Sequence, residues 1–245
     1  MPLVRIESEE IKRYTASDEL TDKRFHCWCI IYGAFMKTIE RQADSDWRDG
    51  FLFVGDHLAL DFVNTRPSPK GQPVELLTDF RTVLKWFQTA GVIDSESAAR
   101  LVHLHRDSEK AHALATALSF REKLRRAVIS VEHNTGVPPD MVKEVNRLMA
   151  LHPVLHRLEN DGQGAWSIKR WFRPDRPEDL LAPLAYAAAQ LFTETDFTRI
   201  RKCANCVLHF RDTSKKANRR WCSMRLCGNR FKVAVYAAKR RAETE

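Results

Sequence analysis

The stretch that decides the fold of this 245-residue chain is Lys202-Cys-Ala-Asn-Cys206 together with Arg220-Trp-Cys-Ser-Met-Arg-Leu-Cys227. It contains a C-x2-C pair, a gap of fifteen residues and a C-x4-C pair, formed by Cys203, Cys206, Cys222 and Cys227. Two thiolates from a tight knuckle and two from the start of a helix can bind one Zn²⁺ ion at about 2.3 Å. The spacing therefore predicts a tetrahedral zinc site with these four cysteines as ligands.

The cysteines also allow other interpretations, each with an argument against it. Two disulfides would suit a secreted protein, but we expect no signal peptide, and Cys27 and Cys29 form a C-x-C pair with no second pair nearby. Thiol redox chemistry at Cys203 and Cys206 would require a thioredoxin-like βαβ context, which is missing. His209 could replace one ligand, but it alternates with apolar residues and is expected at the surface.

Positive charge is concentrated around the predicted zinc site. From Arg199 to Arg241 the chain has fourteen Lys or Arg and one acidic residue, Asp212, which gives a formal net charge of +13. The whole chain carries +8, so the remaining residues sum to −5. A basic region on an otherwise acidic chain indicates a polyanion as the partner.

The region after residue 196 is predicted to form a treble-clef-like zinc finger. Residues 207–210 and 219–221 can form two short strands, and Ser223 can cap a helix that continues to Arg241. The expected core consists of five side chains: Phe210, Trp221, Leu226, Phe231 and Val235. Because so small a core cannot hold a fold alone, and structural zinc contributes on the order of 10–16 kcal/mol, metal removal is expected to unfold the finger.

The C-terminal helix offers the candidate nucleic-acid contacts. Phe231, Val235 and Ala238 recur at i, i+4 and i+7 and are expected to face the finger. Basic side chains on the other faces suit phosphates, and Asn and Tyr suit base edges. The predicted nucleic-acid-binding residues are Arg219, Arg220, Arg225, Asn229, Arg230, Lys232, Tyr236, Lys239, Arg240 and Arg241. A solvated helix face is the alternative, and Asn229 and Arg230 could instead stabilise the zinc site through its carbonyls or sulfurs.

The part of the chain before the finger is predicted to be mainly α-helical, with one small β-hairpin. Apolar residues recur at three- and four-residue steps, which predicts helices over residues 76–87, 94–104, 114–131, 138–149 and 183–192. Asn160-Asp-Gly-Gln-Gly164 separates two short runs and predicts the hairpin, with Trp166 and Trp171 as core aromatics. Residues 51–54 can form a short strand, whereas the pattern over residues 58–63 fits either a helix or a strand.

Residues 1–48 are predicted to be an appended leader. Met36 is a possible alternative start, so residues 1–35 need not belong to the mature protein. The most apolar part, residues 27–36, is too short to span a bilayer, and no run reaches the roughly 20 apolar residues that a spanning helix requires. We therefore expect a cytoplasmic protein with no membrane partner.

Two motifs resemble known families. Arg220-Trp-Cys-Ser-Met224, Cys227-Gly-Asn-Arg230 and Lys232 closely resemble the CGNR zinc finger, named for that tetrapeptide, over about residues 203–241. Leu60-Asp-Phe-Val-Asn-Thr65 resembles the opening signature of the ABATE domain, which accompanies that finger. The resemblance implies a bacterial, stress-induced transcription regulator whose finger binds DNA.

Together these patterns predict three segments: a leader over residues 1–48, an ABATE-like helical domain over residues 49–196, and a CGNR-type zinc finger over residues 197–245. The predicted function is zinc-dependent DNA-binding transcription regulation, with Zn²⁺ as the cofactor and no enzymatic activity. The alternative is an RNA- or protein-binding zinc module without DNA specificity.

The helical domain is a candidate sensor of a small molecule or a protein. Asp61 and Asn64 are its candidate ligand-binding residues, because they follow an apolar run within the signature. The favoured alternative is that Asp61, Asn64 and Thr65 satisfy local backbone groups.

Overall fold

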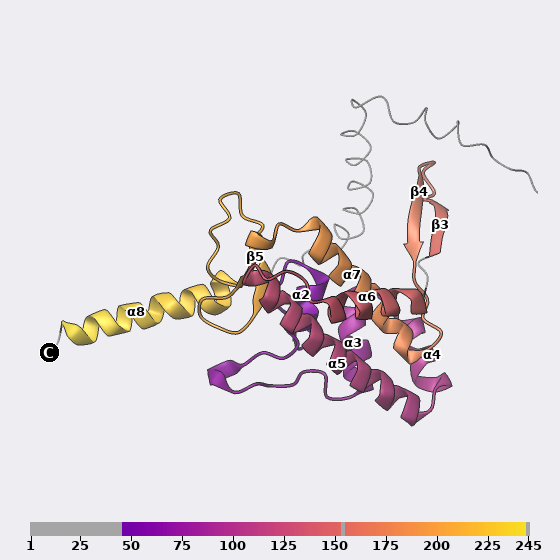
Figure 1. The fold of residues 1–245 in the computed structure, drawn as a ribbon, viewed down its shortest axis with the longest axis horizontal. Helices are drawn as coiled ribbons and strands as arrows, with labels where there is room; N and C mark the ends of the chain where they lie inside the picture. The colour runs from indigo at the N-terminus through magenta and orange to yellow at the C-terminus, as the bar shows by residue number, and fades with distance from the viewer. Residues whose placement is uncertain (1–45, 153–154, 244–245) are drawn as a thin grey trace, which may run out of the picture. The chain divides into compact units, whose positions relative to one another are not determined.

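The computed structural model describes residues 46–152 and 155–243, so nearly all of the predicted leader, including Cys27, Cys29 and Met36, lies outside the described residues. The described chain is mainly helical with small antiparallel hairpins, as predicted (Figure 1). Its α-helices are α2 (Leu58–Val63), α3 (Phe80–Thr89), α4 (Ser95–Leu104), α5 (Asp107–Glu132), α6 (Pro139–Leu151), α7 (Leu181–Glu194) and α8 (Asn229–Ala242).

Within the described residues, the strands form three separate two-stranded antiparallel hairpins. They are β1 (Trp47–Arg48) with β2 (Phe51–Leu52), β3 (Leu155–Asn160) with β4 (Trp166–Trp171), and β5 (Ile200–Lys202) with β6 (His209–Arg211). Short helical turns complete the fold: η2 (Pro69–Gly71), η3 (Pro177–Leu180), η4 (Phe197–Arg199) and the π-helical turn η5 (Met224–Gly228).

The main hydrophobic core surrounds α2, which packs against α5 and α7. Phe62 of α2 is fully buried and meets Trp86 of α3 edge-on, with ring centroids 5.1 Å apart. Residues 59–63 are all buried, so this helix has no polar face to produce a 3.6-residue period. This explains why the sequence pattern could not distinguish a helix from a strand there.

The helix boundaries follow the capping chemistry more closely than the apolar pattern. α3 begins at Phe80 because Asp79 accepts a hydrogen bond from the Thr82 amide at 2.7 Å, and the Thr82 hydroxyl in turn accepts from the Asp79 amide. Its end is marked by Gly91 in the left-handed region at φ 71°, as predicted. Asp94 caps α4 in the same way, accepting from the Ser97 amide.

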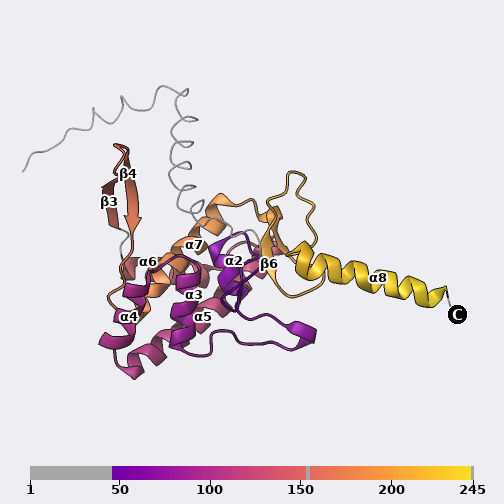
Figure 2. The same cartoon turned by 180° about the vertical axis from the view of Figure 1, so that it is seen from behind.

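The predicted hairpin is present as β3 and β4, and its register pairs Leu158 with Ile168 and Asn160 with Trp166. The expectation that Trp166 is a core aromatic is wrong, because its side chain is 66% exposed. The reason is that Leu158, Ile168 and Trp166 share one face of the hairpin, and none of them packs against the core. Both views show this hairpin separate from the other strands (Figures 1 and 2).

Among residues 46–152 and 155–243, no helix combines the length and the apolar character needed to cross a bilayer.

Candidate metal centre and nucleic-acid interface

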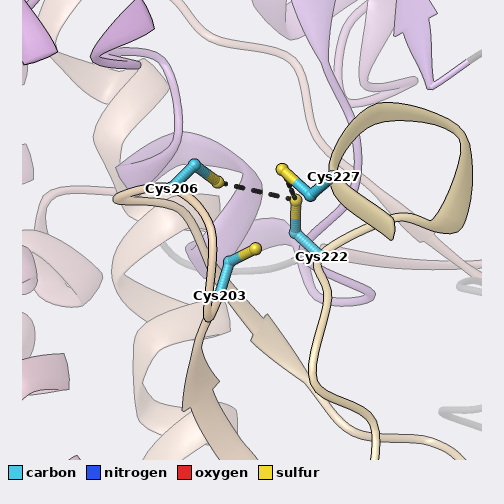
Figure 3. A group of neighbouring side chains, drawn as sticks. All are labelled: Cys203, Cys206, Cys222 and Cys227. Carbon is cyan, nitrogen blue, oxygen red and sulfur yellow. Dashed lines mark hydrogen bonds between the residues drawn. The ribbon is translucent and has the colours of Figure 1, made fainter. Parts of the chain in front are cut away.

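The four cysteines predicted as ligands converge in the finger (Figure 3). Cys203 and Cys206 lie in the turn between β5 and β6, Cys222 precedes η5, and Cys227 lies within it. All four sulfur atoms lie within 4.8 Å of one another. The Sγ of Cys222 is 3.7 Å from the Sγ atoms of both Cys206 and Cys227.

These separations fit a tetrahedral zinc ion. Ligands at about 2.3 Å in a tetrahedron are about 3.8 Å apart, close to the separations found here. A disulfide requires sulfur atoms about 2.05 Å apart, and all four cysteines are free. The donor set and its geometry therefore place a metal ion between the four sulfurs, and Zn²⁺ suits them.

Local hydrogen bonds hold the chain in the conformation that brings the four cysteine sulfur atoms together. The amide of Cys203 donates to the Leu208 carbonyl at 2.9 Å and closes the knuckle. The hydroxyl of Ser223 accepts from the amides of Arg225 and Leu226 at 3.1 and 3.3 Å, so Ser223 caps the first helical turn as predicted. Cys227 sits in that turn, and its amide donates to the Ser223 carbonyl.

The close approach of the four cysteine sulfur atoms favours a bound cation between them. Hydrogen bonds with Cys203 and Cys206, together with burial, raise the pKa of the Cys222 thiol. Four thiolates this close repel one another strongly, and a divalent cation between them offsets the repulsion. When bound, the ion supplies the cross-link that holds the knuckle to η5.

The hairpin of the finger and the position of His209 differ from the prediction. The finger's hairpin is β5–β6, which flanks the knuckle, and residues 219–221 form no strand because the Arg219 amide donates to the Asp212 carboxylate instead of pairing with β6. His209 is also not at the surface: it is 2% exposed, and it is not part of the metal cluster.

The core of the finger contains side chains from outside it. Phe210 is fully buried as predicted, but it packs in one cluster with Leu52 and Val54, which belong to the segment before α2. Phe231 and Val235, expected in this core, are 38% and 51% exposed. The segment around β2 occupies the place that the α8 side chains were expected to fill. The short, continuous apolar run at residues 51–54 was the signal in the sequence for this contribution.

Asn64 joins the helical body to the finger. Its carboxamide is fully buried, donates to the His209 carbonyl at 2.8 Å and accepts from the His209 amide at 3.0 Å. Nearby, the Arg211 amide donates to the Gly55 carbonyl at 2.8 Å. The edge of β6 is therefore held by the body on both sides of Phe210.

The other polar residues of the 60–65 motif also have internal partners. Asp61 accepts from the Gly55 amide at 2.7 Å, and burial raises the pKa of its carboxyl to about 7. Thr65 donates to the Phe62 carbonyl at 2.7 Å and accepts from the buried guanidinium of Arg121 at 3.0 Å. These contacts favour the structural interpretation of Asp61 and Asn64 over the ligand-binding one.

The arginines predicted to contact nucleic acid divide into two kinds. The guanidinium of Arg219 is partly buried, and it donates to the Asp56 carboxylate of the body and to the carbonyls of Trp221 and Cys222. It also lies 4.5 Å from the centre of the Phe210 ring. Arg219 therefore stabilises the finger, whereas Arg220 is exposed and stacks over Trp221 at 5.0 Å.

The remaining predicted contact residues are all exposed. α8 buries none of its side chains, and both views show it extending from η5 with no described element alongside (Figures 1 and 2). The exposed candidates on η5 and α8 are Arg225, Asn229, Arg230, Lys232, Tyr236, Lys239, Arg240 and Arg241.

The finger and the body each match a protein-family model. The first model covers residues 56–195, more than half of the chain, and describes ABATE, "Putative stress-induced transcription regulator". The chain belongs to the ABATE family. A second model, the CGNR zinc finger, matches residues 199–240 and includes all four clustered cysteines. No curated protein matches the chain.

The ABATE and CGNR matches agree with the resemblance drawn from the two motifs. They give a zinc-finger protein of a regulator family, and neither model describes an enzyme. The contacts of Asn64 and Asp56 with the finger show that the ABATE domain and the CGNR finger are packed together in this chain.

Proposed function

We propose that this ABATE protein is a cytoplasmic, zinc-dependent transcription regulator that binds duplex DNA through its finger and α8. The observation that carries the proposal is a basic helix in which no side chain is buried. None of the fourteen residues of this helix is buried, and apart from contacts such as that of Phe231 with Trp221, whose ring centroids are 4.8 Å apart, it gains little from packing within its own chain. Such a helix is best explained by a partner that covers it.

The charge of this helix supports DNA as that partner. Arg230, Lys232, Lys239, Arg240 and Arg241 give α8 five basic side chains and no acidic one between Asn229 and Ala242. A helix of this size fits the major groove of B-DNA, which is about 12 Å wide. In this arrangement the basic residues neutralise phosphates, and Asn229 and Tyr236 are the candidates for base contacts.

The zinc site supports the same proposal indirectly. Ser223 and Cys227 set the direction in which η5 and α8 leave the finger, and the metal fixes Cys227 against the knuckle. Loss of the ion would therefore release the base of α8. Arg219 contributes by holding the finger together, so we propose Arg220 and the α8 residues as the phosphate contacts.

Salt dependence tests this function. If about five phosphates are contacted, the logarithm of affinity for duplex DNA falls against the logarithm of salt concentration with a slope of about −4.5. The measurement is fluorescence anisotropy with the zinc-loaded full chain over a range of salt. An affinity independent of salt would contradict the proposal.

Competition separates DNA from the alternative partners. Unlabelled duplex DNA should displace the probe at lower concentration than structured RNA or heparin. Preference for RNA would assign the finger to RNA binding. Equal displacement by heparin would show that the finger binds any polyanion through charge alone.

Tyr236→Ala should weaken DNA binding while the zinc content stays at one ion per chain, because Tyr236 is exposed and away from the cysteines.

A further inference from the structure

The finger carries a second basic element, the loop of residues 213–218 between β6 and Arg219. Lys215 and Lys216 lie in it, and both are exposed. The predicted set of nucleic-acid-binding residues did not include them. Hydrogen bonds with Asp212, Arg199 and Arg201 fix the orientation of the peptide groups in this loop.

Asp212 anchors the start of the loop. Its side chain is completely buried and accepts hydrogen bonds from the Ser214 amide at 2.9 Å, the Ser214 hydroxyl at 2.6 Å and the Arg219 amide at 2.8 Å. Burial alone would raise the pKa of this carboxyl, but the hydrogen bonds from Ser214 and Arg219 lower it. An ionised, fully engaged Asp212 therefore fixes both ends of the loop.

Two arginines of the segment around β5 take up the carbonyl groups of the loop. Arg199 donates to the carbonyls of Asp212 and Ser214, each at 2.9 Å. Arg201 donates to the carbonyl of Ala217 at 2.8 Å. The negative ends of three peptide groups are thus turned toward half-buried guanidinium groups beneath the loop.

The positive ends of the same peptide groups must then face the other way. In a trans peptide the N–H and C=O bonds point in opposite directions, and no peptide bond of the described chain is cis. The amides that share these peptide groups belong to Thr213, Lys215 and Asn218, all three exposed residues. The outer side of the loop therefore presents backbone N–H groups beside two ammonium groups, an arrangement that favours anions.

We propose that the loop of residues 213–218 is a phosphate-binding element of the finger, with Lys215 and Lys216 supplying charge and the outward amides supplying hydrogen bonds. The proposal rests on the proposed DNA binding and names a second contact, in addition to α8. Lys216 is four residues from Arg220, so their Cα atoms are at most about 15 Å apart. A duplex carries a phosphate about every 1.7 Å of its length, so both residues can reach one DNA molecule.

The test is the double variant Lys215→Ala/Lys216→Ala in the full, zinc-loaded chain. Each phosphate contact contributes about −0.9 to the salt slope, so the variant should have a slope shallower by about 0.9 to 1.8 than the wild type. Affinity should fall by a similar factor for every duplex sequence, because phosphates carry no sequence information. Zinc stoichiometry confirms that the finger is folded.

The matched control is Lys85→Ala/Lys143→Ala, which removes the same charge from exposed positions on α3 and α6. Its salt slope should equal that of the wild type. An unchanged slope in the loop variant would overturn the inference, as would an equal change in the control. If the wild type itself binds no duplex DNA, the proposed function fails first. If the alanine pair loses zinc, Lys215→Gln/Lys216→Gln gives the deciding slope.

Discussion

Asn64 makes two buried hydrogen bonds between the body and the finger, one to the carbonyl and one to the amide of His209. Asn64→Ala leaves the amide and the carbonyl of His209 buried without partners. Each unsatisfied group costs about 1–3 kcal/mol, so we expect a loss of about 2–6 kcal/mol in the free energy of unfolding. Chemical denaturation of the zinc-loaded chain measures it.

The control for this prediction is Asn146→Ala on an exposed position of α6. It should change the free energy of unfolding by less than about 0.5 kcal/mol. Equal stability of the two variants would show that the Asn64 carboxamide does not link the body to the finger.

Asp61 gives the stability a dependence on pH. Its pKa is raised from 3.8 to about 7 by burial, so the folded chain binds a proton that the unfolded chain releases. The contribution is favourable below about pH 4 and is lost as pH rises through about 7, at a cost on the order of a few kcal/mol. Asp61→Asn keeps an oxygen acceptor for the Gly55 amide and removes the titration.

We therefore expect Asp61→Asn to be more stable than the wild type at pH 8, and its advantage should be clearly smaller at pH 5. Thermal unfolding at both pH values checks this. Parallel pH profiles of the two proteins would be evidence against a raised pKa at Asp61.

Among the structural elements, the segment of β2 contributes to the core of the finger, because Leu52 and Val54 pack in the cluster that contains Phe210. Leu52→Ala removes a buried side chain from the cluster that contains Phe210 and three of the cysteines. We expect a loss of about 2–5 kcal/mol and a weaker affinity for zinc, although Leu52 is distant from the cysteines in sequence. Competition with a chromogenic zinc chelator measures the affinity.

Leu104→Ala, at an exposed position after which α4 ends, is the matched substitution. Its zinc affinity should be that of the wild type. A Leu52→Ala protein with unaltered zinc affinity would mean that the finger folds independently of β2.

The elements also show what a sequence can and cannot predict. α3 to α7 were predicted because each buries one face, so its apolar residues repeat with the helical period. α2 is buried all around and has no such period. The zinc site was predicted because four cysteines with suitable spacing define it locally. The contact of Asn64 with His209 joins residues 145 positions apart, and nothing in the local pattern of either residue signals the other.

At the scale of the whole molecule, the described residues, 46–152 and 155–243, belong to one compact unit that includes both the ABATE body and the finger. Zinc removal by a strong chelator should therefore affect more than the finger. Once Cys222 and Cys227 are released, Leu52 and Val54 lose part of their cover, and the body loses the contacts of Asn64. We expect the melting temperature of the body to fall together with that of the finger.

Hydrogen exchange measured by mass spectrometry checks this prediction. Peptides that cover α2 should exchange faster after chelation, and readdition of Zn²⁺ should restore their protection. If α2 keeps its protection while the finger exchanges freely, the two parts are energetically independent.

The shared packing of β2 with Phe210 has a consequence for protein engineering. A transplant of residues 197–245 into another host would leave behind Leu52 and Val54, two of the side chains that enclose Phe210. In such a chimera the apolar surface around Phe210 would be exposed to solvent, and the isolated finger would be prone to self-association. A transferable finger would have to combine two segments that are distant in the sequence: residues 197–245 and the stretch around residues 46–56.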